Sequence, residues 1–250
     1  MRAVLTYHSI DHSGSPISVD PAAFERHVRW LASGKVQVTT LAGLAACPAD
    51  AQAVALTFDD GFENFATHAA PLLTGHGLPA TVFVVTDHVG RTNAWNGRAA
   101  AAIPTLPLLD WAALERLVAA GISLGAHTRT HRPLTHLDAA AIEDEIAGSA
   151  ECLRRRLGVA PQAFAYPYGA VTQAASDKVS ETFSWGCTTE HRPFGMSERP
   201  ALIPRLDMYY YRAAGRLEAW QTASFKRHLM VTQQRRHLRS LLNLARSGKA

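Results

Sequence analysis

The chain has 250 residues, 47% hydrophobic and 18% charged, a composition typical of a globular protein with one large or two small domains. Its apolar runs fall short of the ~18 residues that cross a membrane, and its three isolated cysteines indicate neither a disulfide framework nor a cysteine metal cage. The net charge of +4 is uneven, because residues 219–250 hold seven Lys or Arg and no acid, while residues 1–218 carry 18 bases and 21 acids. Basic character therefore belongs to the tail, and no nucleic-acid binding is expected; binding by the tail is a further alternative, which no recognised binding motif supports.

Short β-rich runs alternate with helical patterns, which favours parallel strands joined by helices. Asp20, Asp110 and Asp138 are N-cap residues for helices expected at 21–33, 111–120 and 139–157, each followed by glycine. The segments 88–107 and 190–200 lack periodicity and are expected to be loops beside a functional site. The expected strands are Ala3–His8, Val36–Leu41, Val54–Phe58, Ala80–Val85, Ser123–Ala126, Ala163–Tyr166, Gly186–Thr189 and Leu202–Leu206.

No repeat or low-complexity linker divides the chain, so we expect one α/β domain over residues 1–215 and a basic helical extension over residues 216–250. In that extension Leu238, Leu241, Leu242 and Ala245 share one helical face. The favoured interpretation packs this stripe on the domain, and the alternative lays the helix on an anionic membrane surface. Without an apolar signal segment at the start, a cytoplasmic location is expected, peripheral at the inner membrane surface under the alternative.

Two polar motifs follow expected strands. Thr57-Phe58-Asp59-Asp60-Gly61 ends an apolar run, and His127-Thr128-Arg129-Thr130-His131 places two imidazoles four positions apart after a second run. One carboxylate and two neutral imidazoles can hold a divalent cation, and the second carboxylate is then free to act as a base. Each motif alone also fits a turn or a solvated helix face. Two such motifs at strand exits together favour a mononuclear metal site.

These motifs, followed by Phe164-Ala165-Tyr166-Pro167-Tyr168-Gly169, resemble in order those of the polysaccharide deacetylase family, also called NodB-homology or carbohydrate esterase family 4. The resemblance extends over residues 3–207. It implies a distorted, TIM-like (β/α)7 barrel and a metal-dependent hydrolase that removes N- or O-acetyl groups from sugars. The implied substrate is an N-acylated sugar, as a glycoside or a lipid-linked saccharide.

The resemblance also assigns roles to individual residues. Asp59 corresponds to the general base, and the metal ligands correspond to Asp60, His127 and His131. The backbone N–H of Tyr168 corresponds to a group that binds the oxyanion. Such a ligand set implies one divalent metal, with zinc favoured and cobalt, nickel or iron as alternatives.

The chain departs from the family pattern at two places. Ala165 stands where the family has an arginine that orients the base, and Arg205 is the candidate replacement, with a surface arginine as the alternative. The late histidine motif is absent, and His8 resembles the acid of a circularly permuted branch that deacetylates poly-N-acetylglucosamine; the alternative is a packing role. These departures keep open a second hypothesis, a non-catalytic carbohydrate- or partner-binding barrel. Trp95, on a polar loop, is the aromatic residue best suited to line a sugar groove.

Overall fold

The structure is a computed structural model that describes residues 1–95, 97 and 100–247, with side chains described up to residue 238. Its strands are β1 (Arg2–Tyr7), β2 (Ser9–Ile10), β3 (Ser18–Val19), β4 (Gln37–Thr39), β5 (Ala53–Phe58), β6 (Ala80–Val84), β7 (Ser123–Ala126), β8 (Ala163–Ala165), β9 (Trp185–Cys187) and β10 (Leu206–Asp207). Its α-helices are α1 (Pro21–Leu31), α2 (Leu41–Ala46), α3 (Ala70–Gly75), α4 (Trp111–Ala119), α5 (Ala139–Leu157), α6 (Gln173–Thr182) and α7 (Ala223–Ser247).

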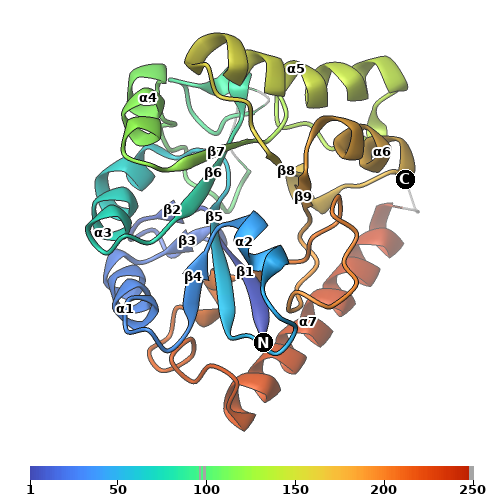
Figure 1. Ribbon diagram of the computed structural model, residues 1–250. Helices are drawn as coiled ribbons and strands as arrows, with labels where there is room; N and C mark the ends of the chain where they lie inside the picture. Colours follow the sequence, from blue (N-terminus) through green and yellow to red (C-terminus); the bar gives the residue numbers. More distant parts are fainter. Residues whose placement is uncertain (96, 98–99, 248–250) are drawn as a thin grey trace.

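The main sheet is parallel and curls into a barrel. Its strands lie in the order β10-β1-β5-β6-β7-β8-β9, and β4 pairs with the first half of β5. A parallel bridge between Cys187 and Ile203 joins β9 to the segment that leads into β10, so the two ends of the sheet meet. Figure 1 shows the helices arranged around this curled sheet. The predicted α/β class and distorted barrel are confirmed.

Helix starts follow the predicted capping chemistry. The carboxylates of Asp20, Asp110 and Asp138 each accept a hydrogen bond from a backbone N–H two or three residues later, at the starts of α1, α4 and α5. These bonds satisfy donors that have no partner inside the helix. Gly158 ends α5 with φ of 67°, a left-handed conformation that favours glycine. Local side-chain chemistry therefore sets these boundaries.

Two expected strands are wrong in extent. The strand expected over Val36–Leu41 stops at Thr39, because the side chain of Thr40 accepts a hydrogen bond from Gly43 N–H and caps α2, so that Leu41 is helical. The strand expected over Leu202–Leu206 is reduced to a bridge at Ile203 and the short β10. Pro204 interrupts it because proline has no N–H to donate to a sheet.

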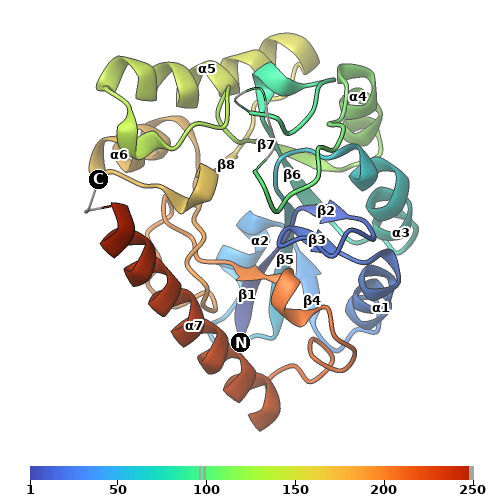
Figure 2. The same ribbon diagram turned by 180° about the vertical axis from the view of Figure 1, so that it is seen from behind.

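The C-terminal helix α7 packs on the barrel through one face. Phe225 is 1% exposed and lies against the rings of Tyr211 and Trp220, and Leu229 is also buried. Figure 2 shows the helix running along the outside of the molecule. The prediction that Leu238 packs on the domain is wrong, since this side chain is 59% exposed. The side chains of Leu241, Leu242 and Ala245 lie outside the described residues.

No helix in the described part of the chain combines the length and apolar character that crossing a membrane requires.

Candidate active site

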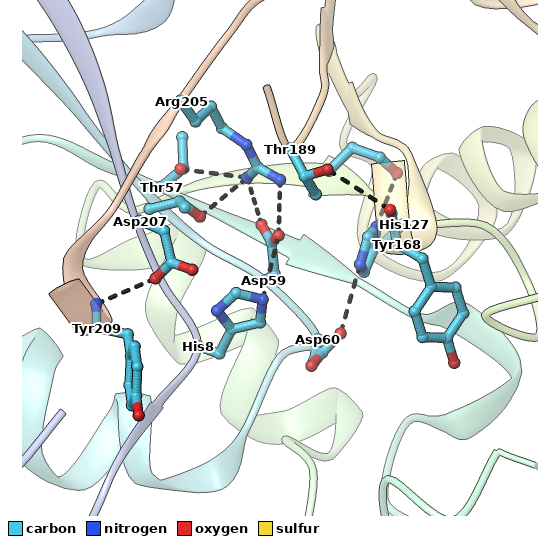
Figure 3. Close-up of polar contacts among 12 residues, drawn as sticks. His8, Thr57, Asp59, Asp60, His127, Tyr168, Thr189, Arg205, Asp207 and Tyr209 are labelled. Carbon is cyan, nitrogen blue, oxygen red and sulfur yellow. Dashed lines mark hydrogen bonds and ion pairs between the residues drawn. The ribbon is translucent and has the colours of Figure 1, made fainter. Parts of the chain in front are cut away.

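The predicted site residues converge at the carboxyl ends of the parallel strands. This is the end of a (β/α) barrel where catalytic groups gather. Figure 3 shows most of them around one centre. His8 follows β1, the Asp59–Asp60 pair follows β5, His127 follows β7, Tyr168 follows β8, and Arg205 precedes β10.

Asp60, His127 and His131 form a buried cluster suited to a metal ion. The Asp60 Oδ1 atom lies 3.4 Å from His127 Nε2 and 3.2 Å from His131 Nε2, and one ligand atom from each residue lies within 4.8 Å of the others. Ligand atoms about 2.1 Å from a tetrahedral zinc ion are separated by about 3.4 Å. The donor set and its spacing therefore fit one divalent cation.

Both histidines are oriented by contacts at their other ring nitrogen. His127 Nδ1 donates to the backbone carbonyl of Ala165 at 2.7 Å, and His131 Nδ1 lies 3.0 Å from the Tyr168 hydroxyl. Such bonds fix the ring and leave Nε2 available for a cation. The side chain of Tyr168 thus touches a candidate ligand, although 61% of this residue is exposed.

Asp59 is held by a buried arginine. Arg205 Nη1 and Nη2 donate to the two Asp59 carboxylate oxygens at 2.6 and 2.7 Å, a bidentate pair. The guanidinium also donates to the Thr188 carbonyl and the Thr6 hydroxyl, and Arg205 is 1% exposed. The alternative of a surface arginine is therefore wrong. Removing either partner of such a buried pair costs about 3–5 kcal/mol, because the other charge is left uncompensated.

His8 lies beside the base. Its Nε2 is 3.7 Å from Asp59 Oδ2, and its side chain is 24% exposed. Figure 3 shows Asp207 of β10 on another side of the imidazole. Burial raises the pKa of Asp207, and the nearby His8 and Arg236 act in the opposite direction. Sequence reasoning missed Asp207, which no motif marks and which reaches the site through pairing of β10 with β1.

The two carboxylates of the site have lowered pKa values despite their burial. Burial acts to raise the pKa of Asp60, but hydrogen bonds from His127 and His131 outweigh it and hold this pKa well below its usual range. Burial likewise opposes ionisation of Asp59, and Arg205 and His8 reverse the effect and lower the pKa. Although burial lowers the pKa of His127, the two aspartates raise it overall. Burial lowers the pKa of His131, which favours the neutral imidazole that binds a metal, and the ionised aspartates that attract a proton to His127 also attract a metal cation.

The backbone of the site is strained. Among the described residues, positive φ at a non-glycine residue occurs at Asp60 (70°), Thr128 (64°), His131 (62°) and Tyr168 (59°), and otherwise only at Gln221. Each left-handed residue costs roughly 1 kcal/mol or more, so surrounding contacts must hold it. Because four of these five strained residues lie in or beside the Asp60, His127 and His131 cluster, the strain indicates a functional site.

The loop that carries both histidines is anchored at two points. The Thr128 hydroxyl accepts a hydrogen bond from His131 N–H at 2.9 Å, which joins the two ends of the motif. Glu145 of α5, only 4% exposed, accepts from Arg129 N–H at 2.8 Å and Thr130 N–H at 2.9 Å. Sequence reasoning missed Glu145. The only available signal was an acid on the buried stripe of an amphipathic helix.

The cluster opens into a cleft of about 180 Å³. Trp95 lines this cleft and stacks on His131, with ring centroids 4.3 Å apart and an interplanar angle of 28°. Ile103, from the same segment 88–107 as Trp95, and Ile17, from the loop between β2 and β3, add apolar walls. Trp95 therefore lies where a ligand would enter, although one of its faces is covered by the histidine.

Comparison with known proteins agrees with this geometry. A family model described as polysaccharide deacetylase matches residues 47–182. The YxkH protein of Bacillus subtilis is 26% identical over 194 residues, 75% of this chain and 64% of that protein. The poly-beta-1,6-N-acetyl-D-glucosamine N-deacetylase of Staphylococcus aureus is 24% identical over 204 residues, 76% of this chain and 67% of that protein.

Solved structures share the fold. The Streptococcus pyogenes deacetylase PplD, in complex with acetate, superposes with a TM-score of 0.69 at 20% identity, over 82% of this chain and 91% of that one. At this identity the likeness concerns the fold. The chain also spans less than two thirds of the length of the B. subtilis relative, at 64%.

Proposed function

Because the chain belongs to the polysaccharide deacetylase family, we propose that it is a metal-dependent hydrolase that removes an acetyl or other small acyl group from the nitrogen of a sugar. The observation that carries the proposal is the position of the Asp59–Arg205 pair beside the Asp60, His127 and His131 cluster. It combines a positioned base with a cation site, and these two groups together can activate water for attack on an amide.

In this proposal each residue of the site has a separate chemical role. A divalent cation held by Asp60, His127 and His131 would polarise the acyl carbonyl and acidify a water molecule. Asp59, kept ionised by Arg205, accepts the proton of the attacking water. The backbone N–H of Tyr168 donates to the oxyanion that develops on the carbonyl oxygen.

His8 is the proposed acid for the second half of the reaction. The amide nitrogen needs a proton before the C–N bond breaks, because an amine anion is a very poor leaving group. His8 lines the same cleft as Asp59, and its Nε2 lies 3.7 Å from that carboxylate. A proton taken by the base therefore has a short path to the histidine that delivers it.

The substrate class follows from the family and the cleft. We propose an N-acylated sugar, either a glycoside or a saccharide carried on lipid; the S. aureus relative is named for a poly-N-acetylglucosamine substrate. Two imidazoles and one carboxylate favour zinc, and cobalt, nickel and iron also suit such ligands. The alternative of a non-catalytic binding barrel rested on two departures from the family pattern, and it loses the support of one, Ala165 in place of an arginine, because Arg205 contacts Asp59.

The test measures acetate release from N-acetylglucosamine oligomers and metal content together. Purified protein should contain one divalent metal per chain, lose activity after chelation and regain it when zinc, cobalt or nickel is added. Asp60→Ala and His131→Ala should abolish metal binding. Protein that keeps full activity without metal, or that binds oligomers with metal present but never releases acetate from any N-acylated sugar, would contradict the proposal.

A further inference from the structure

Helix α7 presents two different faces. The inner face is buried on the barrel through Phe225, Leu229 and Thr232, which are 1%, 8% and 4% exposed. At 100° per residue, the outward side is centred on Arg227 and extends over about 140° to include Met230, Val231, Arg235 and Leu238. We call these five residues the outer face of α7.

The outer face gathers exposed apolar side chains. Met230, Val231 and Leu238 are 58%, 38% and 59% exposed, and they are three of the five large hydrophobic side chains exposed in the described part of the chain. The other two are Met196, in a loop, and Tyr168, in the short helix Pro167–Gly169. These apolar side chains lie on the side of the helix that faces away from the barrel. They therefore have no role in the barrel core.

The basic residues on this face are uncompensated. Arg227 and Arg235 are exposed and make no ion pair with any described residue, and no acid occurs after residue 218. Arg29 and Arg154, which are also exposed, are by contrast paired with Glu25 and Glu151. The outer face thus offers free positive charge interleaved with apolar groups.

We propose that the outer face of α7 binds the surface of a bilayer rich in anionic lipid. Apolar side chains enter the boundary between headgroups and acyl chains, while arginines contact the anionic headgroups, and a helix lying in the membrane plane satisfies both. A second copy of the chain is a poor occupant, because the same face would bring like charges together. Nucleic acid would leave Met230, Val231 and Leu238 without apolar contacts.

The inner side of the same helix reaches the rim of the catalytic cleft. Arg236 donates to the backbone carbonyl of Thr189 at 2.8 Å and lies 3.5 Å from Asp207 Oδ2. Thr189 in turn lines the cleft. Helix α7, bound to a bilayer, would therefore contact the cleft rim directly through Arg236. This arrangement would suit a saccharide carried on a lipid in that bilayer. This consequence for the substrate rests on the proposed function, whereas membrane binding does not.

The test is cosedimentation of the full chain with vesicles at low ionic strength. Vesicles of phosphatidylcholine and phosphatidylglycerol at about 7:3 should bind the protein, and pure phosphatidylcholine vesicles should bind it at least tenfold more weakly. A basic residue near an anionic surface contributes about a fivefold factor in affinity, so Arg227→Gln with Arg235→Gln should weaken binding by roughly 20- to 30-fold. Met230→Gln with Val231→Thr and Leu238→Gln should weaken it by a similar factor.

Matched controls are Arg154→Gln and Met196→Gln, which remove an exposed cation and an exposed apolar side chain away from α7. Both should leave vesicle binding unchanged, and thermal melts should confirm that every variant folds. Equal binding to neutral and anionic vesicles, no binding to either, or equal losses in the controls would overturn the inference. Vesicle binding is scored without turnover, so a protein that binds vesicles but releases no acetate contradicts only the proposed function.

Discussion

Asp59 is the residue on which the proposed chemistry depends most directly. It lies next to the candidate ligand Asp60 yet is paired with Arg205, not with the two histidines. Asp59→Asn should therefore lower turnover by about 10²- to 10⁴-fold while metal content stays near that of the unchanged protein. Initial rates of acetate release and elemental analysis check it. Asp60→Asn is the comparison that should lose metal and activity together; equal metal loss in Asp59→Asn would make Asp59 a ligand.

His8 allows a test that separates catalysis from packing. An amide must have its nitrogen protonated, whereas an activated aryl acetate ester has a leaving group that needs little protonation. His8→Ala should lower amide hydrolysis by about 10²-fold or more and change ester hydrolysis only slightly. His12→Ala is the control, because this histidine is exposed and bonded to Asp20 outside the cleft. Similar losses on both substrates, or none on either, would assign His8 to packing.

Most side chains of the cluster could be predicted at the residue scale because their motifs are local. Adjacency is enough to identify Asp59 with Asp60, and the spacing of four positions is enough to identify His127 with His131. Glu145 could not be found this way, since its partners are backbone N–H groups that every residue has. The bidentate geometry of Arg205 depends on a contact across 146 positions, which no local pattern encodes.

At the scale of elements, α5 supports the loop that carries both histidines. When the contacts that support metal ligands are weakened, the metal affinity of the site typically falls 10- to 100-fold. Glu145→Ala should therefore weaken zinc binding by about that factor, measured by competition with a chromogenic chelator. Glu145→Gln keeps an acceptor oxygen and should recover most of the affinity. Glu151→Ala on the same helix removes an exposed carboxylate and should have no effect; weakening of equal size there would show that α5 acts only through overall stability.

The boundaries of elements were predictable where one side chain decides them. Aspartate caps placed α1, α4 and α5 within a few residues, because a carboxylate before a helix satisfies free N–H groups whatever the rest of the fold does. Strand extents were less predictable, as β4 and β10 show. A strand continues only where a neighbour offers matching hydrogen bonds, and that neighbour is distant in sequence.

At the scale of the whole molecule, the alternation of strands and helices predicted parallel strands joined by helices, whereas the tail was predicted to pack through the wrong part of its helix. A helical stripe shows that a helix has an apolar face, and it does not show which surface covers that face. In α7 the buried apolar side chains among the described residues are Phe225 and Leu229, whereas Leu238, the first residue of the later stripe, is exposed. The extension therefore joins the core at its start, through the rings of Trp220 and Tyr211.

A buried histidine outside the metal cluster links this packing to pH. His27 of α1 is 1% exposed, lies 3.1 Å from the Tyr7 hydroxyl, and donates through Nε2 to the Tyr211 carbonyl at 3.1 Å. It thereby joins helix α1 to strand β1 and to the short helix Met208–Tyr211 that follows β10. Burial lowers the pKa of His27 from 6.5 to about 4, because a charged imidazole loses its solvation there.

Stability should therefore fall in mild acid. Between pH 6.5 and about 4 the unfolded chain binds a proton at His27 that the folded chain does not, so the contribution is complete above pH 6.5 and lost as the pH falls towards 4. The loss amounts to roughly 3 kcal/mol in the free energy of unfolding. Urea unfolding of the metal-free protein across this range measures it. His27→Gln should flatten the profile by about that amount, and exposed His12→Gln should leave it unchanged; a profile unaltered by His27→Gln would place the acid sensitivity in other groups.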